Sequence, residues 1–365
     1  MKEKKLTFVC PCYNHENYVV VFLNSLLAQN NPNWELLIID DCSTDASVTK
    51  IKSIKDERIH LIQNLYNQGI NATFSKGVED AKTEVISFVA SDDLLYPEYV
   101  ETVLKTFEEN PQIVACYTPL NHMNPQGELL NTITPLPTDK TGSQIFAHMF
   151  VNENLLPSPG MAFKKSVLAP YLPLDTGLLQ YSDYQMHFFI LFQNRIKLLE
   201  KPLVQYRVSP KGACARSSAS LLREDIETEK LMNAVLNLIK LDKEVFLKYF
   251  GNYPLIQENK IDSETIPFWL GRLALTSRIE AKQKWGLQTI MNFIAKAENL
   301  ALLHKLYNFS YKDYMGYATL INSSTFQTPD ISGIKKIYKR KIRKLKKIII
   351  FLVVLCLIFG GFLCR

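Results

Sequence analysis

The first 120 residues alternate between short apolar runs and longer stretches with helical periodicity. The short runs are rich in β-branched and aromatic residues, which is typical of buried strands. Strand and helix in alternation predict an α/β fold: a mostly parallel sheet flanked by helices, with a Rossmann-like nucleotide-binding half. The predicted strands are 6–10, 34–40, 58–63, 84–90 and 112–118, and the clearest helices are 18–29 and 97–110.

The pattern changes further along the chain. Residues 120–215 carry turn-rich loops between shorter apolar runs. Residues 216–326 place Leu, Ile and aromatic side chains at helical spacing, which is typical of helices packed on a core. We therefore expect an α/β domain over 1–215 and a helical C-terminal domain of unknown role over 216–330.

The positive charge of the chain is concentrated at its C-terminal end. Residues 331–365 hold ten Lys and Arg and no acidic residue, so the overall net charge of +6 becomes −4 for the rest. The basic segment 331–347 precedes an uncharged run of 17 residues, 348–364, which as a helix would measure about 26 Å against a hydrocarbon core of about 30 Å. This predicts a transmembrane or membrane-anchor helix.

The positive-inside rule then places the basic segment, and the domains before it, at the cytoplasmic face of the cell membrane. A hairpin lying in one leaflet is the alternative, whereas a nucleic-acid-binding tail would leave the apolar run unexplained. The opening apolar run is short and interrupted by Pro11, so a secretory signal is not expected. The seven cysteines include no Cys-x-x-Cys pair, and we expect reduced, mostly buried thiols.

Two adjacent carboxylates, Asp92 and Asp93, follow the fourth predicted strand. Neighbouring side chains of an extended segment point to opposite faces, so one carboxylate can face a sugar hydroxyl while the other faces a cation. A hard divalent cation, Mg²⁺ or Mn²⁺, takes oxygen ligands of this kind together with substrate phosphates. The alternative is that Asp92 or Asp93 caps the helix that begins near Pro97.

Other strand ends carry similar chemistry. Asp40 and Asp41 follow the second predicted strand, and Tyr13 and Asn14 follow the first. Ligands of open parallel sheets bind outside the carboxyl ends of the strands, so these side chains predict a pocket for a base, a ribose and a diphosphate. Because no glycine-rich phosphate loop is present, a metal has to bridge the phosphates.

The motifs "VCPCYNHENYV", "LLIIDDCSTD", "NQGINATFSKG" and "FVASDDLLYPEYV" resemble, in order and spacing, those of family 2 glycosyltransferases with the GT-A fold. The resemblance covers residues 5 to about 210. It implies a UDP-, GDP- or dTDP-sugar donor, a divalent cation and transfer with inversion at the anomeric carbon. It also implies site roles: Pro11 and Tyr13 would line the nucleobase site, Asp41 would bind the base or ribose, Asp92 the ribose and Asp93 the metal.

The second half of the resemblance concerns "QYSDYQMHFF". It implies that Asp183 is the catalytic base, and an inverting displacement requires such a group to take the proton of the acceptor hydroxyl. Ser182 stands where the family usually has Glu. The alternative is that Ser182 and Asp183 only cap a helix. His187, one turn further on, is expected to be a packed core residue.

Several positions depart from the family pattern or only extend it. Phe74 and Ser75 stand where the family often has Arg-Asn, which leaves Lys76 as a possible phosphate contact. Pro157, Ser158 and Gly160 would shape a loop beneath the acceptor. Arg207 would contact the diphosphate, or serve as a buried salt-bridge partner, and Arg216 is a weaker candidate.

We therefore expect an inverting, metal-dependent glycosyltransferase that acts on a glycan or lipid-linked acceptor in cell-surface polysaccharide synthesis. A membrane anchor suits an acceptor carried on a lipid, because tethering raises its effective concentration. The partners expected are the nucleotide-sugar donor, the acceptor and the membrane, and no nucleic acid. The alternatives are a nucleotidyltransferase and a catalytically degenerate glycan-binding or scaffold subunit.

Overall fold

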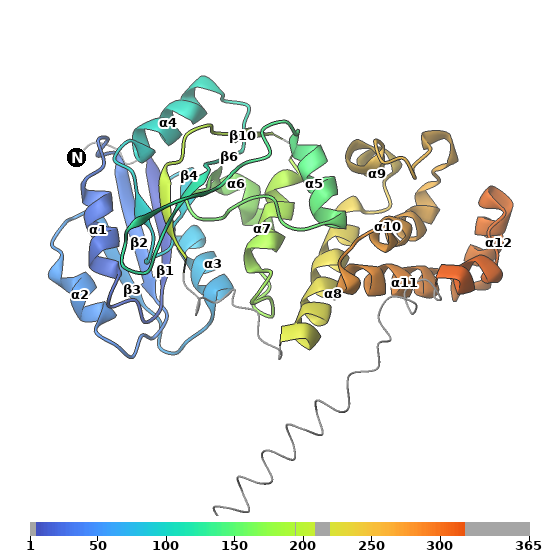
Figure 1. The fold of residues 1–365 in the computed structure, drawn as a ribbon, viewed down its shortest axis with the longest axis horizontal. Coiled ribbons are helices and arrows are strands. Elements are labelled where there is room, and N and C mark those ends of the chain that lie inside the picture. Colours follow the sequence, from blue (N-terminus) through green and yellow to red (C-terminus); the bar gives the residue numbers. More distant parts are fainter. Residues whose placement is uncertain (1–4, 194, 209–219, 318–365) are drawn as a thin grey trace, which may run out of the picture. The chain divides into compact units, whose positions relative to one another are not determined.

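A computed structural model of the chain describes residues 5–193, 195–208 and 220–317 (Figure 1). The chain divides into two compact units, residues 1–309 and 310–365. The helices and strands named below all belong to the first unit.

The first unit is built on a seven-stranded sheet with the order β10-β6-β9-β4-β1-β2-β3 (Figure 1). Each pairing is parallel except the two made by β9, which is antiparallel to β4 and β6. The prediction of a mostly parallel sheet is confirmed, and β9 makes it a mixed one. The strands are β1 (Leu6–Cys12), β2 (Trp34–Asp40), β3 (Ile59–Gln63), β4 (Val85–Phe88), β6 (Ala115–Tyr117), β9 (Ala162–Lys164) and β10 (Ile196–Leu198).

Helices cover both faces of this sheet. On one face, apolar side chains of α1 (Val19–Leu27) and α4 (Tyr99–Glu109) share a core with alternate residues of β1. On the other face lies α3 (Ile70–Asp80), where a Cβ on Gly77 would stand 2.4 Å from Val9 Cγ1, so glycine permits the close approach of this helix. The short helix α2 (Ser47–Ser53) packs beside α1.

A second, four-stranded sheet has the order β5-β11-β7-β8. Its strands are β5 (Leu94–Leu95), β7 (Leu120–Met123), β8 (Leu129–Thr134) and β11 (Val204–Arg207). Because β5 begins directly after Asp93, this sheet brings the end of β11 against the loop that follows β4. Between β8 and β10 in sequence lie α5 (Gly142–Val151), α6 (Lys165–Leu168), the 3₁₀ turn η1 (Ala169–Tyr171) and α7 (Ser182–Leu191).

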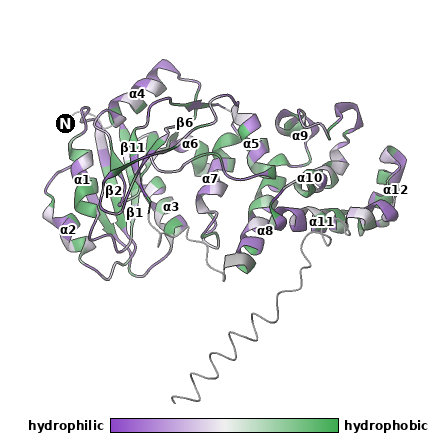
Figure 2. Ribbon diagram, viewed as in Figure 1, coloured by the Kyte–Doolittle hydropathy of each residue, from purple (hydrophilic) through white to green (hydrophobic). Residues whose placement is uncertain are grey.

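The remaining described chain is mostly helical, as the spacing of apolar residues predicts. Its helices mix hydrophobic and hydrophilic residues (Figure 2), and the buried ones are mostly hydrophobic. Helices α10 and α11 cross so closely that a Cβ on Gly286 would lie 2.6 Å from the carbonyl oxygen of Gly271, and glycine at this position permits the crossing. The elements are α8 (Ser220–Ile239), α9 (Lys243–Phe250), η2 (Glu258–Lys260), η3 (Ser263–Thr265), α10 (Ile266–Leu275), α11 (Glu280–Ile294) and α12 (Ala297–Tyr307).

Some predictions fall outside the described residues. These are the basic segment 331–347, the anchor 348–364 and Arg216. Within the part that the structure describes, no helix is both long enough and apolar enough to span a bilayer. The four cysteines in this part are free thiols, and three of them are buried.

Candidate active site

The loops that follow β1, β2 and β4 meet at one edge of the large sheet and are joined by hydrogen bonds. The backbone N–H of Asn14 donates to Ser43 Oγ at 2.9 Å, and Thr44 N–H donates back to Asn14 Oδ1 at 2.8 Å. His15 Nδ1 lies 2.6 Å from Ser91 Oγ, which ties the first loop to the third. The structure therefore brings together the three strand ends that the sequence singles out.

Tyr13 leaves the first loop with 46% of its surface exposed. A half-exposed ring with no aromatic partner among the described residues offers a flat face to a planar ligand. Pro11, two residues earlier in the sequence, is half-buried. That Pro11 and Tyr13 line the nucleobase site stays a prediction, and the exposed ring of Tyr13 is compatible with it.

Asp41 is buried, and both of its oxygens accept hydrogen bonds from the β3–α3 loop. Oδ1 accepts from Asn64 Nδ2 at 2.8 Å and from the N–H of Gln68 at 2.9 Å, and Oδ2 accepts from the N–H of Gly69 at 2.8 Å. Gly69 has a φ of 84°, which glycine adopts without strain. Asp41 thus fixes the β3–α3 loop. Its predicted contact with the base or ribose stays a prediction.

The two carboxylates after β4 have different surroundings. Asp92 is half-buried, whereas Asp93 is only 3% exposed. Asp93 Oδ1 accepts the backbone N–H of Arg207 at 2.8 Å, and Oδ2 is buried without a hydrogen-bond partner. Burial, and then the neighbouring charge of Asp92, raise the pKa of Asp93 well above its ordinary value.

An unpaired, buried carboxylate oxygen is costly unless a ligand satisfies it, and a divalent cation is the ligand that suits its chemistry. Within the described residues, no group of three or more His, Cys, Asp and Glu could hold a metal ion alone. The unpaired oxygen of Asp93 therefore fits the chemistry of one cation ligand, and cation binding there stays a prediction.

Arg207 is buried at the end of β11, and its guanidinium spans two turns. Nε donates to the carbonyl oxygen of Asp92 at 2.8 Å, and Nη1 donates to the carbonyls of Asn124 and Pro125 at 3.1 and 2.9 Å. The guanidinium carbon also lies 4.6 Å from the centre of the Tyr18 ring. Arg207 thus holds the turn that carries the carboxylate pair, and its predicted diphosphate contact stays a prediction.

Asp183 lies in the first turn of α7 and reaches the loop before β9. Ser158 Oγ donates to Asp183 Oδ2 at 3.0 Å. Gly160, with a φ of 73°, fixes this loop by donating its N–H to the carbonyl of Phe88 at the end of β4 at 2.9 Å. The buried hydroxyl of Tyr99 donates to the Gly160 carbonyl at 2.9 Å. The candidate base is thereby linked to the strand that delivers Asp92 and Asp93.

A residue that sequence reasoning missed organises the start of α7. Glu227 of α8 has a side chain only 1% exposed, and its Oε2 accepts the N–H groups of Gln180 and Tyr181 at 2.7 and 2.9 Å. Its Oε1 forms an ion pair with Arg223 Nε at 3.4 Å. The N-cap residue of α7 is Tyr181, whose side chain makes no cap, and Glu227 from another helix accepts its backbone N–H. In the sequence Glu227 is one charge among several on a helix, so no local signal identifies it.

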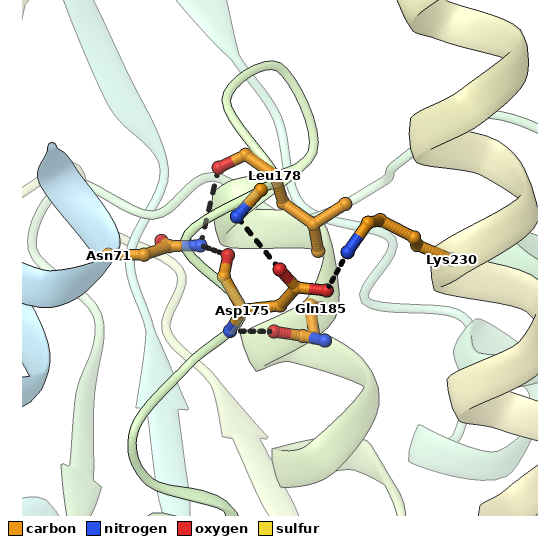
Figure 3. Close-up of polar contacts among 6 residues, drawn as sticks. Asn71, Asp175, Leu178, Gln185 and Lys230 are labelled. Carbon is orange, nitrogen blue, oxygen red and sulfur yellow. Dashed lines mark hydrogen bonds and ion pairs between the residues drawn. The ribbon is translucent and has the colours of Figure 1, made fainter.

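The loop before α7 is held from three helices (Figure 3). Asn71 Nδ2 of α3 donates to the carbonyls of Asp175 and Leu178 at 2.6 and 3.3 Å. Gln185 Oε1 of α7 accepts the N–H of Asp175 at 3.1 Å, and Lys230 Nζ of α8 lies 2.7 Å from Asp175 Oδ2. Two of the three helices are far from this loop in sequence, so the position of Asp183 depends on tertiary contacts.

The departures in "NQGINATFSKG" have structural roles. Phe74 is buried against aromatic rings of the sheet, and Ser75 Oγ accepts the N–H of Leu174 at 3.0 Å. Lys76 Nζ lies 3.4 Å from Asn64 Oδ1. Phe74 therefore packs α3 on the sheet, Ser75 holds the loop that leads to Asp183, and phosphate binding by Lys76 stays a prediction.

Comparison with known proteins gives one family and several named relatives. The model of glycosyl transferase family 2 matches residues 7–168. The glycosyltransferase GlyA of Streptococcus pneumoniae is 28% identical over 69% of this chain, but the match spans only 36% of that protein. The Escherichia coli protein WfgD, named a UDP-Glc:alpha-D-GlcNAc-diphosphoundecaprenol beta-1,3-glucosyltransferase, is 24% identical over 61% of this chain and 85% of its own length.

A solved structure of residues 1–349 of S. aureus TarS in complex with UDP-GlcNAc has a TM-score of 0.55 to this chain. The two are 16% identical, and the alignment covers 79% of this chain and 88% of the other. At this identity the likeness concerns the fold, and it confirms the predicted GT-A-like α/β architecture. The family match ends before α7, so the assignment of Asp183 depends on the geometry above.

Proposed function

Because this chain is a glycosyltransferase of family 2, we propose that it moves a sugar from a nucleotide-diphosphate sugar to a glycan or lipid-linked acceptor, with inversion at the anomeric carbon, in cell-surface polysaccharide synthesis. One observation carries the proposal: a half-exposed tyrosine, a buried carboxylate with an unpaired oxygen and a candidate base converge at one sheet edge. The alternatives of a nucleotidyltransferase and an inactive subunit are set aside, since the named relatives are glycosyltransferases.

In the proposed reaction the acceptor hydroxyl oxygen attacks the anomeric carbon from the face opposite the diphosphate. The bond between that carbon and the diphosphate oxygen breaks, and its electron pair leaves with the nucleoside diphosphate. Asp183 takes the proton of the acceptor hydroxyl as the new bond forms. A single displacement of this kind inverts the anomeric centre.

Asp93 is the residue that would hold a divalent cation, through its unpaired Oδ2. When bound, Mg²⁺ or Mn²⁺ would neutralise charge on the departing diphosphate. Asp92, on the more exposed side of the same turn, is free to accept hydrogen bonds from the ribose hydroxyls. Arg207 supports this turn by donating its backbone N–H to Asp93 Oδ1 and its Nε–H to the carbonyl oxygen of Asp92.

The names of the similar proteins support a UDP-sugar and a lipid-linked acceptor as the first substrates to test. A cytoplasmic, membrane-anchored chain would meet such an acceptor at the bilayer, and the proposal therefore includes the anchor at 348–364, on the strength of its sequence.

The test is a donor screen with the purified full-length chain. UDP-, GDP- and dTDP-sugars are supplied with Mg²⁺, Mn²⁺ or EDTA and a polyprenyl-diphosphate-linked sugar, and released nucleoside diphosphate is measured. Asp183→Asn and Asp93→Asn should each lower turnover by about 100-fold or more, while exposed Asp80→Asn serves as the matched control. Equal turnover by wild type, Asp183→Asn and Asp93→Asn would overturn the assignment.

A further inference from the structure

A buried line of hydrogen bonds runs inward from Asp183. Ser158 Oγ lies 3.0 Å from Asp183 Oδ2 and 3.1 Å from His187 Nε2. His187 Nδ1 lies 3.2 Å from the hydroxyl of Tyr117 on β6. His187 and Tyr117 are fully buried and Ser158 is 4% exposed, so the half-buried carboxylate is the end of the line that faces solvent.

The number of available protons decides which atom donates in each of these three hydrogen bonds. An ionised carboxylate only accepts, so the single hydroxyl proton of Ser158 points to Asp183. Ser158 Oγ must then accept the Nε2–H of His187, and the bare Nδ1 accepts the Tyr117 hydroxyl. Burial lowers the pKa of His187 to about 4, against the opposing influence of Asp183 and a hydrogen bond with the Leu156 backbone, which keeps the ring neutral as this arrangement requires.

We propose that Ser158 and His187 are positioning residues for the catalytic base. They hold Oδ2 of Asp183 in a fixed direction and so present Oδ1 to the acceptor hydroxyl. This inference rests on the proposed function, in which Asp183 removes the acceptor proton. It also replaces the expectation that His187 only fills the core, because a side chain chosen for packing alone would not need two oriented ring nitrogens.

The hydrogen bond from Ser158 would keep Asp183 in the position that proton transfer requires. A proton transfer requires its base within hydrogen-bond reach of the acceptor, and small misplacements of reacting groups cost large factors in rate. Ser182 cannot orient Asp183 through a carboxylate as a glutamate could, since it is a short neutral side chain. The Ser158 hydrogen bond instead fixes the base from the interior of the fold.

The test uses Ser158→Ala, His187→Phe and His187→Gln in the full-length chain. The first two variants should lower kcat by about 10- to 100-fold while changing the donor KM by less than about 3-fold, because the donor is bound by other loops. His187→Gln keeps a donor near the position of Nε2 and should recover most of the lost kcat. His60→Phe, which replaces a half-exposed histidine of β3 outside this line, is the matched control.

The outcomes separate this inference from the proposed function. If Asp183→Asn keeps wild-type turnover, the proposed function itself is wrong. If Asp183→Asn is inactive but Ser158→Ala and His187→Phe stay within about twofold of wild-type kcat, the positioning inference alone is overturned. In the double variant, His187→Phe should not lower the residual turnover of Asp183→Asn further. Both residues then act through one group, as the inference requires. Should His187→Phe fail to fold, Ser158→Ala, which removes only a hydroxyl, decides the question.

Discussion

Replacing Glu227 with alanine tests whether α8 holds the backbone at the start of α7, the helix that carries Asp183. The substitution removes a carboxylate that is 1% exposed and accepts two backbone N–H groups, of Gln180 and Tyr181, at 2.7 and 2.9 Å. A hydrogen bond to a charged group contributes about 1.5 to 3 kcal/mol, so losing two should cost about 3 to 6 kcal/mol of unfolding free energy. Single domains have about 5 to 15 kcal/mol in total, so the loss is a large fraction of the stability and is readily measured.

The assay is urea unfolding together with steady-state kinetics. Glu229→Ala, an exposed position on the same helix, controls for the loss of a charge from α8 and should change stability by less than about 0.5 kcal/mol. Because the two amides lie two and three residues before Asp183, Glu227→Ala should also lower kcat more than it weakens donor binding. Equal unfolding midpoints for the two alanine variants would refute the argument that Glu227 fixes this loop.

Three further outcomes are expected. The folded pKa of His187, about 4, lies below its ordinary 6.5, so the unfolded chain binds more protons between these values. Stability should therefore fall by about 3 kcal/mol as the pH drops from 6.5 through 4, and His187→Phe should remove that part of the pH dependence in urea titrations. Asp93→Ala should abolish the response of turnover to Mn²⁺, while Asp92→Ala should mainly raise the donor KM; identical kinetics for both would contradict their separate roles. Gly286→Ala would place a Cβ 2.6 Å from the Gly271 carbonyl oxygen, so it should lower stability by about 1 to 3 kcal/mol, as thermal unfolding can check.

The features predicted well from the sequence are those with local causes. The apolar runs that form β1 and β2 are short, β-branched and bounded by polar loops, so their period identifies them without knowledge of the fold. The meeting of Tyr13 with Asp92 and Asp93 at one edge follows from a geometric rule for parallel strands. The two carboxylates do differ in burial, but strand alternation is not the reason: β4 ends at Phe88, and the pair lies in a turn in which the N–H of Asp93 donates to the carbonyl of Ala90.

The features that were missed depend on residues far apart in the chain. The pairing of β9 between β4 and β6 carries no signal in its three residues. The bond from Glu227 to the backbone before α7 spans more than forty positions, and in sequence this glutamate resembles any other charge on an amphipathic helix. His187 is buried as expected, but its hydrogen bonds were not predicted, since its partners Ser158 and Tyr117 come from other segments.

The attachment of the loop before α7 has a consequence for how such enzymes can be recombined. Residues 172–181 are bound by side chains of α8 as well as by α3 and α7 (Figure 3). A chimera that exchanges only the C-terminal helices between relatives would separate Glu227 and Lys230 from the backbone they hold. The piece to transplant as a unit is therefore 172–239, which carries the proposed base Asp183, its loop and the helix α8 that holds the loop.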